Sequence, residues 1–416
     1  MVDASLLPLL SRLGLDAVIP EAREVQRAYK KALRAGEGRD VEALREAAAV
    51  LSSAGTRSEY IQSHRLPSAG EPPLAIGAKP VARGVQHTGG EPTARSGCPG
   101  FGFASCQGKR PTMEDELIIG VPLGAKRYAF GVCDGHGGPR AARLLARHLP
   151  SALSKHLKYA AQRKGNEDGD DLPGAALEAF DEVDQHILES SVHERWDDGS
   201  TAIVAVVDVP HDGGPAAAVT LLQVGDGGAC LWRGNASSSL AAAAAISESD
   251  PCDNPPSEHL CTRHRPCEPS EAVRLSSHGV EASATGRVAG LAVSRAFGDL
   301  SIKSLPNGSY LTVEPEVTSL SAHEISGGSG INGGSAVLVL ACDGLWDYLS
   351  TDEVNSVLSS ALDREGAEEG APDLQGAALA LVDEALLSGS GDNVSVLLVE
   401  LRSSWSCTHV HVGVGS

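Results

Sequence analysis

The sequence is poor in three things: aromatic side chains, long apolar runs and excess positive charge. Aromatic residues make up 4% of the 416 residues, and the formal net charge is −20. A nucleic-acid-binding protein needs a basic face, so this charge argues against nucleic acid as a partner. No apolar run approaches the roughly 20 residues of a membrane-spanning helix, so we expect no membrane partner.

Signals for secretion are also missing. The nine cysteines are an odd number, and they lack the spacing of a disulfide framework, which suits a reducing compartment. The apolar residues 6–10 are few, include Pro8 and lead to no cleavage pattern. We therefore expect a cytoplasmic or nuclear protein.

Composition divides the chain into four parts. Residues 1–66 carry apolar residues at helical spacing on either side of Gly36 and Gly38, which predicts a small helical hairpin. Residues 67–98 are rich in Pro and Gly without apolar periodicity, which is typical of a flexible linker. We expect one catalytic domain over residues 99–403 and a tail over residues 404–416.

Within residues 99–403, strand-like and helix-like segments alternate in groups. Short apolar runs predict strands at 128–133, 201–207, 218–224, 336–341 and 394–401, and another starts at Leu117. Helical patterns cover roughly 139–158, 174–190, 351–363 and 374–388. This order indicates sheets covered by helices, an α+β or αββα fold. Residues 235–262 and 322–335 look like surface insertions.

The strongest chemical signal is an Asp just beyond an apolar strand. It is followed by Gly at Asp134-Gly135, Asp226-Gly227 and Asp343-Gly344, and a related Asp392-Asn393 precedes the last strand. A further acidic pair, Glu114-Asp115, precedes the run from Leu117. One Asp-Gly alone is usually a turn, but carboxylates at several strand ends can converge on one point.

Convergent carboxylates repel one another unless cations neutralise them. Because these motifs contribute oxygen ligands and no Cys or His cluster, we expect Mg²⁺ or Mn²⁺. Two such ions about 3.5–4 Å apart activate water and clamp a phosphate for in-line attack.

At this level of detail the chain resembles the metal-dependent protein phosphatase family, the type 2C Ser/Thr phosphatases. The motifs run in order from about Phe101 to Leu401. They are Arg110-Pro-Thr-Met-Glu-Asp115, Asp134-Gly-His-Gly-Gly138, Asp198-Gly-Ser-Thr-Ala202, Leu291-Ala-Val-Ser-Arg-Ala-Phe-Gly-Asp299, Asp343-Gly-Leu-Trp-Asp347 and Asp392-Asn393. The resemblance implies a four-layer αββα sandwich of two antiparallel sheets flanked by helices, and a metal-dependent protein-serine/threonine phosphatase that forms no phosphoenzyme. It also favours a monomer.

The resemblance also implies roles for individual residues. Asp134 would bridge two metals, the Gly135 carbonyl would bind one of them, and Asp343 with Asp392 would complete the other shell. Glu114 and Asp115 would support the site directly or through water, and Asp226 with Asp343 would hold a third, weaker metal. Arg110 would take the substrate phosphate through its planar fork, and His136 is the natural general acid for the leaving Ser/Thr oxygen.

Neighbouring residues fit supporting roles. Ser200 and Thr201 suit a turn and strand, Arg295 and Asp299 suit a structural ion pair, and Trp346 suits the core; Asp347 and Asn393 belong to the supporting set. Where the family usually has Gly-Asp-Ser-Arg, this chain has Gly225-Asp226-Gly227-Gly228. We therefore expect some loss of rigidity or of third-metal affinity. The family pattern resumes at Thr262-Arg263-His264-Arg265-Pro266 and Glu271.

Two further patterns leave alternatives open. Cys252, His259, Cys261, His264 and Cys267 raise a zinc hypothesis, but their spacing matches no common zinc module. Residues 12–61 resemble a degenerate J-domain in which Glu37-Gly38-Arg39 stands where the His-Pro-Asp tripeptide belongs. The segment then suits a protein-docking or autoregulatory role, and an unrelated amphipathic helical pair is the alternative.

Three functions follow for comparison. The leading one is hydrolysis of phosphoserine and phosphothreonine in phosphorylated proteins. The second is a catalytically weak, phosphatase-like scaffold that binds phosphoproteins, and the third is a chaperone adaptor built on the N-terminal segment. Retention of Arg110, Asp134, His136, Asp343 and Asp392 favours the enzyme. The missing tripeptide weakens the adaptor.

Overall fold

The computed structural model describes residues 98–124, 126–164, 171–210, 216, 218–234, 259–326, 336–362 and 372–402. The N-terminal segment and the linker predicted from the sequence lie outside these residues, as does the tail. With the exception of the last turns of one helix, the described elements belong to one compact unit, Val85–Val382 with Gly391–Ser416. None of the described helices is both long enough and apolar enough to cross a membrane.

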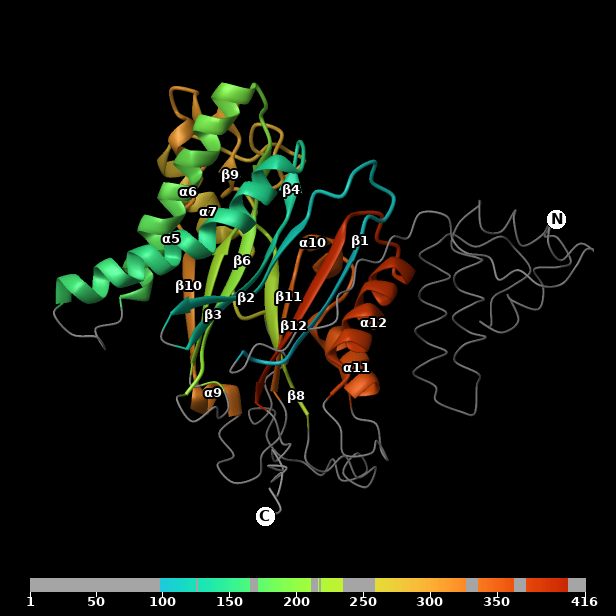
Figure 1. Ribbon diagram of the computed structural model, residues 1–416. Coiled ribbons are helices and arrows are strands. Elements are labelled where there is room, and N and C mark those ends of the chain that lie inside the picture. The colour runs from blue at the N-terminus through green and yellow to red at the C-terminus, as the bar shows by residue number, and fades with distance from the viewer. Residues whose placement is uncertain are drawn as a thin grey trace, which may run out of the picture. The chain divides into compact units, whose positions relative to one another are not determined.

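Two antiparallel sheets form the centre of the fold (Figure 1). The first has the order β1-β12-β11-β8. Its strands are β1 (Phe101–Cys106), β12 (Val394–Arg402), β11 (Ala336–Ala341) and β8 (Gly228–Arg233). The second has the order β10-β7-β6-β3-β2. Its strands are β10 (Glu316–Ser321), β7 (Ala218–Val224), β6 (Ala202–Asp208), β3 (Arg127–Cys133) and β2 (Glu116–Gly124).

The two sheets pack against each other through one apolar cluster. That cluster includes Phe130 of β3, Ile203 of β6, Leu338 of β11 and Leu397 of β12, each no more than 1% exposed. These strands consist mainly of apolar residues because both of their faces are covered. Side chains alternate between the faces of a strand, so successive residues of one strand enter different cores.

Strand β6 shows the alternation directly. Ile203 and its alternate neighbours join the cluster between the sheets, whereas Ala202, Val204 and Val206 join a second cluster under two long helices. These helices are α5 (Arg140–Lys164) and α6 (Leu172–Glu194), which lie side by side on the outer face of the five-stranded sheet (Figure 1). They contribute Leu145, Leu149 and Phe180 to that core.

The outer face of the four-stranded sheet is covered by α11 (Thr351–Leu362) and α12 (Leu374–Leu387). The indole Nε1 of Trp232 in β8 donates to Ser359 Oγ of α11 at 3.0 Å. Gln375 of α12 exchanges hydrogen bonds with the backbone of Phe103 in β1. Short helices α9 (Ala322–Ser326) and α10 (Asp343–Trp346) follow β10 and β11.

A small third sheet has the order β4-β5-β9. It connects the segment that follows Asp134 to a separate layer of loops. Its strands are β4 (Gly135–His136), β5 (Gly199–Ser200) and β9 (Phe297–Gly298). The loop layer contains α7 (Pro269–Ser277), α8 (Leu300–Lys303) and the 3₁₀ helix η3 (Gly308–Tyr310). It has its own small apolar cluster, which includes Leu275, Val293 and Tyr310.

The predicted α+β class with antiparallel sheets and helices is confirmed. The strands at 218–224 and 336–341 and the starts of α11 and α12 agree with the sequence pattern. Helix α5 extends six residues beyond the predicted end at 158. The pattern missed β1, β8, β10 and the small sheet. One predicted insertion, 322–335, begins as helix α9.

Candidate active site

The acidic motifs meet where strands of both large sheets end. Asp134 follows β3, Asp226 follows β7, Asp343 follows β11, and Asp392 precedes β12. Asp115 lies one residue before β2. Because the sheets pack face to face, strand ends that are far apart in the sequence become neighbours. Burial raises the pKa of Asp134, and the negative charges of the other four carboxylates raise it further.

Asp115, Asp134 and Cys342 form the tightest group. One ligand atom of each lies within 4.8 Å of the others. Asp115 is 6% exposed, and neither of its carboxylate oxygens has a hydrogen-bond partner. A buried carboxylate without partners is costly, so these two oxygens fit a cation. The Cys342 thiol was not expected, because only oxygen ligands were predicted from these motifs.

Burial and neighbouring charge raise the pKa values of these carboxyls. Burial raises the pKa of Asp115 to about 6, with a further contribution from the charge of Asp392. Burial also raises the pKa of Asp343 to about 7, together with the charges of Asp226, Asp347 and Asp392. A bound cation would offset both causes, because its positive charge would stabilise the ionised carboxylates. The oxygen-rich donor set therefore fits Mg²⁺ or Mn²⁺.

Asn393 fixes the loop that carries Arg110 and Glu114. Its Oδ1 accepts from the Glu114 backbone N–H at 2.8 Å, and its Nδ2 donates to the carbonyls of Gln107 and Thr112. The Arg110 guanidinium donates to Asp392 Oδ2 at 2.6 Å, and its side chain is 58% exposed. Arg110 therefore lies beside the acidic cluster and remains open to solvent.

His136 pairs with Asp299. Its Nε2 lies 2.9 Å from Asp299 Oδ2 and 3.0 Å from Oδ1. Burial of the ring opposes its positive charge, but the hydrogen bond and the charge of Asp299 outweigh burial, so the pKa of His136 is raised. Asp299 is 4% exposed and has φ of +53°, a left-handed conformation uncommon for residues other than Gly.

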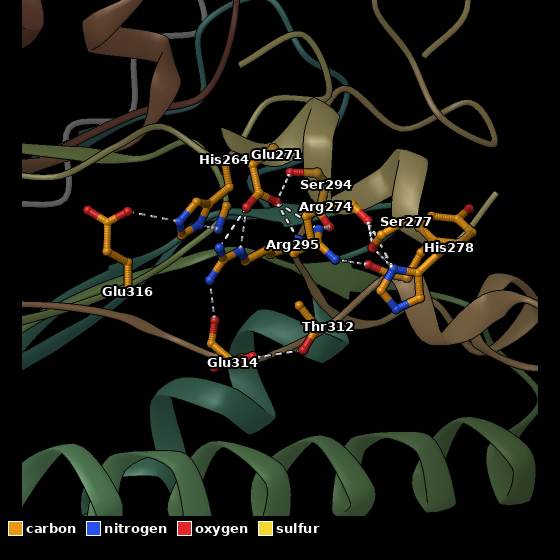
Figure 2. Close-up of polar contacts among 12 residues, drawn as sticks. His264, Glu271, Arg274, Ser277, His278, Ser294, Arg295, Thr312, Glu314 and Glu316 are labelled. Carbon is orange, nitrogen blue, oxygen red and sulfur yellow. Dashed lines mark hydrogen bonds and ion pairs between the residues drawn. The ribbon is translucent and has the colours of Figure 1, made fainter. Parts of the chain in front are cut away.

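The expected ion pair between Arg295 and Asp299 does not form. Arg295 instead bonds Glu271 through Nε at 3.1 Å and Nη2 at 2.6 Å (Figure 2). The Asp299 carboxylate bonds His136. Glu271 is 1% exposed and also binds Arg274 and Ser294. Burial alone would raise its pKa, but these partners lower it below the ordinary value. Arg295 thus belongs to a buried ion cluster in the loop layer.

Asp347 and Asp226 share two arginines. Arg263 Nη2 donates to Asp347 Oδ1 at 2.6 Å, and Arg263 Nε donates to the Asp226 carbonyl at 2.8 Å. Arg265 donates to Asp226 Oδ2 at 2.9 Å and to both oxygens of Asp347. Both arginines lie within the pattern Thr262–Pro266, for which no role was predicted.

The segment around Thr201 supports Asp134 from the small sheet. The backbone N–H of Thr201 donates to the Asp134 carbonyl at 2.8 Å, and the Ser200 hydroxyl donates to the same carbonyl. Gly135 pairs with Ser200 across β4 and β5. Asp198 was quoted in a motif without a role; it accepts from the Arg140 N–H at the start of α5. A Cβ at Gly138 would collide with the Asp198 carboxylate.

The zinc hypothesis is not supported within the described residues. His259, Cys261, His264 and Cys267 do not join any group of three ligands there. Cys261 Sγ approaches Gln223 Oε1, and His259 packs edge-on against Trp346. His264 bonds the backbone of Gly225. Cys252 lies outside the described residues.

Comparisons with known proteins agree with the geometry. The model of the family described as "Protein phosphatase 2C" matches residues 100–394. "Probable protein phosphatase 2C 69" of Arabidopsis thaliana is 31% identical over 321 residues, which cover 76% of this chain and 74% of that protein. "Probable protein phosphatase 2C 59" of Oryza sativa subsp. japonica is 32% identical over 305 residues, covering 72% and 75%.

A solved structure shows the fold. The "Structure of a C.elegans sex determining protein" matches with a TM-score of 0.54 at 19% identity, covering 92% of this chain and 88% of that one. The J-domain resemblance of residues 12–61 gains no support from these comparisons, and the segment lies outside the described residues.

Proposed function

The chain belongs to the protein phosphatase 2C family of metal-dependent protein Ser/Thr phosphatases. On that basis we propose a role for each residue of the acidic site. Asp134, Asp343 and Asp392 would hold two divalent cations, with the Gly135 carbonyl as a further ligand. Asp115 and Glu114 support these ions directly or through water. The four-layer αββα arrangement brings these residues together from both sheets.

The observation that carries this proposal is the pair of partnerless Asp115 oxygens beside Asp134. When bound, Mg²⁺ or Mn²⁺ would neutralise the carboxylates, draw in the phosphate oxygens and lower the pKa of the attacking water. The protein supplies the fixed acidic frame, since each carboxylate lies beside the end of a strand.

Arg110 binds the phosphate of the substrate. Its guanidinium presents a planar fork that fits two phosphate oxygens. The side chain is 58% exposed, so it can reach a phosphoprotein from solvent while its loop stays fixed by Asn393. Its bond to Asp392 Oδ2 aims the guanidinium at the acidic cluster, where the phosphate would lie.

His136 gives a proton to the Ser or Thr oxygen as it leaves. An alkoxide is a poor leaving group at neutral pH, so protonation lowers the barrier. Asp299 holds His136 Nε2, so the Nδ1 proton is the one available to the leaving oxygen. Because Asp299 raises the pKa of His136, the ring carries this proton over more of the neutral range. No residue needs to form a covalent bond to phosphorus.

The substrates are therefore phosphoserine and phosphothreonine in other proteins. The N-terminal segment, residues 1–66, is proposed as a docking or autoregulatory module that a linker, residues 67–98, joins to the catalytic domain, residues 99–403. The catalytic domain acts as a monomer. The competing function is a phosphatase-like scaffold that binds phosphoproteins without turning them over.

Hydrolysis of a phosphothreonine peptide tests the proposal. The full chain is assayed with Mn²⁺, with Mg²⁺ and with EDTA, beside Asp343→Asn and a matched control, Asp181→Asn, which removes an exposed carboxylate on α6. We expect turnover that depends on the metal, persists in Asp181→Asn and falls at least a hundredfold in Asp343→Asn, a loss of about 2.7 kcal/mol. Tight peptide binding without turnover in either metal would favour the scaffold.

A further inference from the structure

The guanidinium of Arg265 lies among three carboxylates at the edge of the acidic cluster. Nη2 is 2.9 Å from Asp226 Oδ2, 2.8 Å from Asp347 Oδ1 and 3.7 Å from Asp343 Oδ2. Nε donates to the same Asp226 oxygen at 2.9 Å. Asp226 is 2% exposed. Asp226 and Asp343 are the two residues that the sequence predicted as ligands of a third cation.

The backbone holds Arg265 against Asp226. The residues just before them, His264 and Gly225, bond each other twice: His264 N–H donates to the Gly225 carbonyl at 2.8 Å, and Gly225 N–H donates to His264 Nδ1 at 3.2 Å. The His264 ring is 1% exposed, and its Nε2 lies 3.4 Å from Glu316 Oε2 (Figure 2). These two hydrogen bonds fix the backbone next to Arg265 and Asp226, so the fold itself holds the two side chains in contact.

The loop after β7 supplies no positive charge of its own. Gly227 and Gly228 stand there, and a Cβ at Gly228 would lie 3.0 Å from Trp346 Nε1. The positive charge comes instead from the segment that starts after the predicted insertion. Arg263 bonds Asp347 and the Asp226 carbonyl, and Arg265 bonds both carboxylates. Two arginines thus contact the aspartate that precedes these glycines.

A third divalent ion does not fit the residues as they are arranged. An ion shared by Asp226 and Asp343 would compete with Arg265 for Asp226 Oδ2, and it would lie beside a fixed positive charge. The guanidinium already provides what such an ion would provide, which is a positive charge that joins the two carboxylates. Its planar fork suits this role because it bonds two groups at fixed angles.

We propose that Arg265 is a built-in cation that occupies the third-metal position, so that this protein binds two divalent ions and excludes a third. The inference rests on the proposed function, because it concerns the same acidic site. Arg265 acts as a positioning residue and touches neither substrate nor the reacting atoms. Its hydrogen bond to Asp226 and its positive charge beside Asp343 orient the two carboxylates.

The test is the number of Mn²⁺ ions bound, measured by titrating the full chain and following free Mn²⁺ by electron paramagnetic resonance. We expect two ions in the unmodified protein and in Arg265→Lys, which keeps the charge. In Arg265→Ala and in Arg265→Gln we expect a third, with an affinity for that ion raised at least about tenfold, the smallest effect of removing a unit charge a few ångströms from a divalent ion. Arg163→Ala, which removes an exposed arginine of α5, should leave the count at two.

Three results would each overturn the inference. They are three ions in the unmodified protein, two ions in both neutral variants, or an unchanged third-site affinity in both. Thermal melts followed by circular dichroism confirm that each variant is folded, and Arg265→Gln keeps most of the side chain in case Arg265→Ala unfolds. If the protein binds no Mn²⁺ and hydrolyses nothing, the proposed function itself fails. If it hydrolyses phosphopeptide but the count is insensitive to residue 265, only this inference fails.

Discussion

His136 Nε2 and Asp299 Oδ2 lie 2.9 Å apart, although 163 residues separate them in the chain. The small sheet brings them together, because β4 contains His136 and β9 ends one residue before Asp299. The pair joins the proposed general acid to the carboxylate that sets its pKa. Its geometry leads to a prediction about the pH dependence of the reaction.

Asp299→Asn should move the alkaline limb of the kcat/KM profile to lower pH. Asp299 raises the pKa of His136, so without its charge the ring loses its proton at lower pH. We also expect a loss of at least about tenfold in kcat at pH 8 on a phosphothreonine peptide.

A matched substrate separates this effect from damage to the site. Nitrophenolate leaves without a proton, so hydrolysis of p-nitrophenyl phosphate should be much less affected by Asp299→Asn. An unshifted alkaline limb with the peptide, or equal losses on the two substrates, would contradict the assignment of His136 as the acid.

Glu271→Gln should destabilise the loop layer strongly. Glu271 bonds Arg274 and Arg295 in a buried cluster (Figure 2), and the neutral variant leaves two guanidinium groups without their anion. Breaking a buried ion cluster from one side costs about 3–5 kcal/mol. Glu281→Gln, at an exposed position nearby in the sequence, should change stability by less than about 0.5 kcal/mol. Chemical denaturation at pH 7 measures both.

The same cluster should weaken in acid. The folded protein holds the pKa of Glu271 below its ordinary value, so the unfolded chain takes up a proton first as the pH falls. The stabilisation is complete above about pH 4.5 and disappears as the pH falls toward the folded-state pKa. The difference between the unmodified protein and Glu271→Gln should therefore shrink below about pH 4. A difference that stays constant from about pH 7 to about pH 3 would rule out this cluster as its source.

The sequence predicted the acidic site better than it predicted the surroundings. Each aspartate follows or precedes an apolar strand, and side chains at strand ends are positioned by the backbone alone. Arg295 shows the limit of this reasoning. Asp299, in the same motif, faces His136 instead. The chain turns at Gly298 and Asp299, two successive residues with positive φ, 74° and 53°. Pairing across such a turn cannot be derived from spacing.

Other differences have a similar origin. The predicted loss of rigidity at Gly227-Gly228 rests on the local sequence alone and stays a prediction. The contacts of Arg263 and Arg265 with Asp226 come from 37 and 39 residues further along the chain, which local sequence does not report. Strands β1, β8 and β10 were missed because their residues are less uniformly apolar or contain glycine. Their formation depends on pairing with β12, β11 and β7, which local periodicity does not report.

Without metal, Asp343→Asn should stabilise the protein at high pH. Folding raises the pKa of Asp343 to about 7 from an ordinary 3.8, so between these values the folded state holds more protons than the unfolded state. Stability from this group therefore falls as the pH rises from about 4 to about 7. In EDTA we expect the variant to be more stable by on the order of 1–3 kcal/mol at pH 8 and nearly equal at pH 4.

Mn²⁺ should reverse that order. The unmodified protein has the Asp343 carboxylate to coordinate the ion, and the variant lacks it. An ion that binds only the folded state raises the melting temperature of the protein. Differential scanning calorimetry at pH 8 with EDTA and with Mn²⁺ gives both values. A variant that is less stable than the unmodified protein in EDTA at pH 8 would show that Asp343 is not under electrostatic strain.

The last prediction concerns Asn393, which orders the phosphate-binding loop without touching the phosphate. Its amide bonds three backbone groups of residues 107–114, the loop that carries Arg110. Asn393→Ala removes all three bonds and leaves the Glu114 N–H without its acceptor, so the loop should become mobile. Arg110 must then be ordered each time substrate binds. The entropic cost of that ordering makes the binding free energy less favourable.

For Asn393→Ala we expect KM for a phosphothreonine peptide to rise about tenfold, and the inhibition constant of inorganic phosphate to rise with it, while kcat changes less. Asn307→Ala, at an exposed asparagine whose side chain makes no capping bond, should leave both constants unchanged. A fall in kcat at constant KM would instead mean that Asn393 acts on the metal ligands beside it, since Asp392 is its neighbour in the chain.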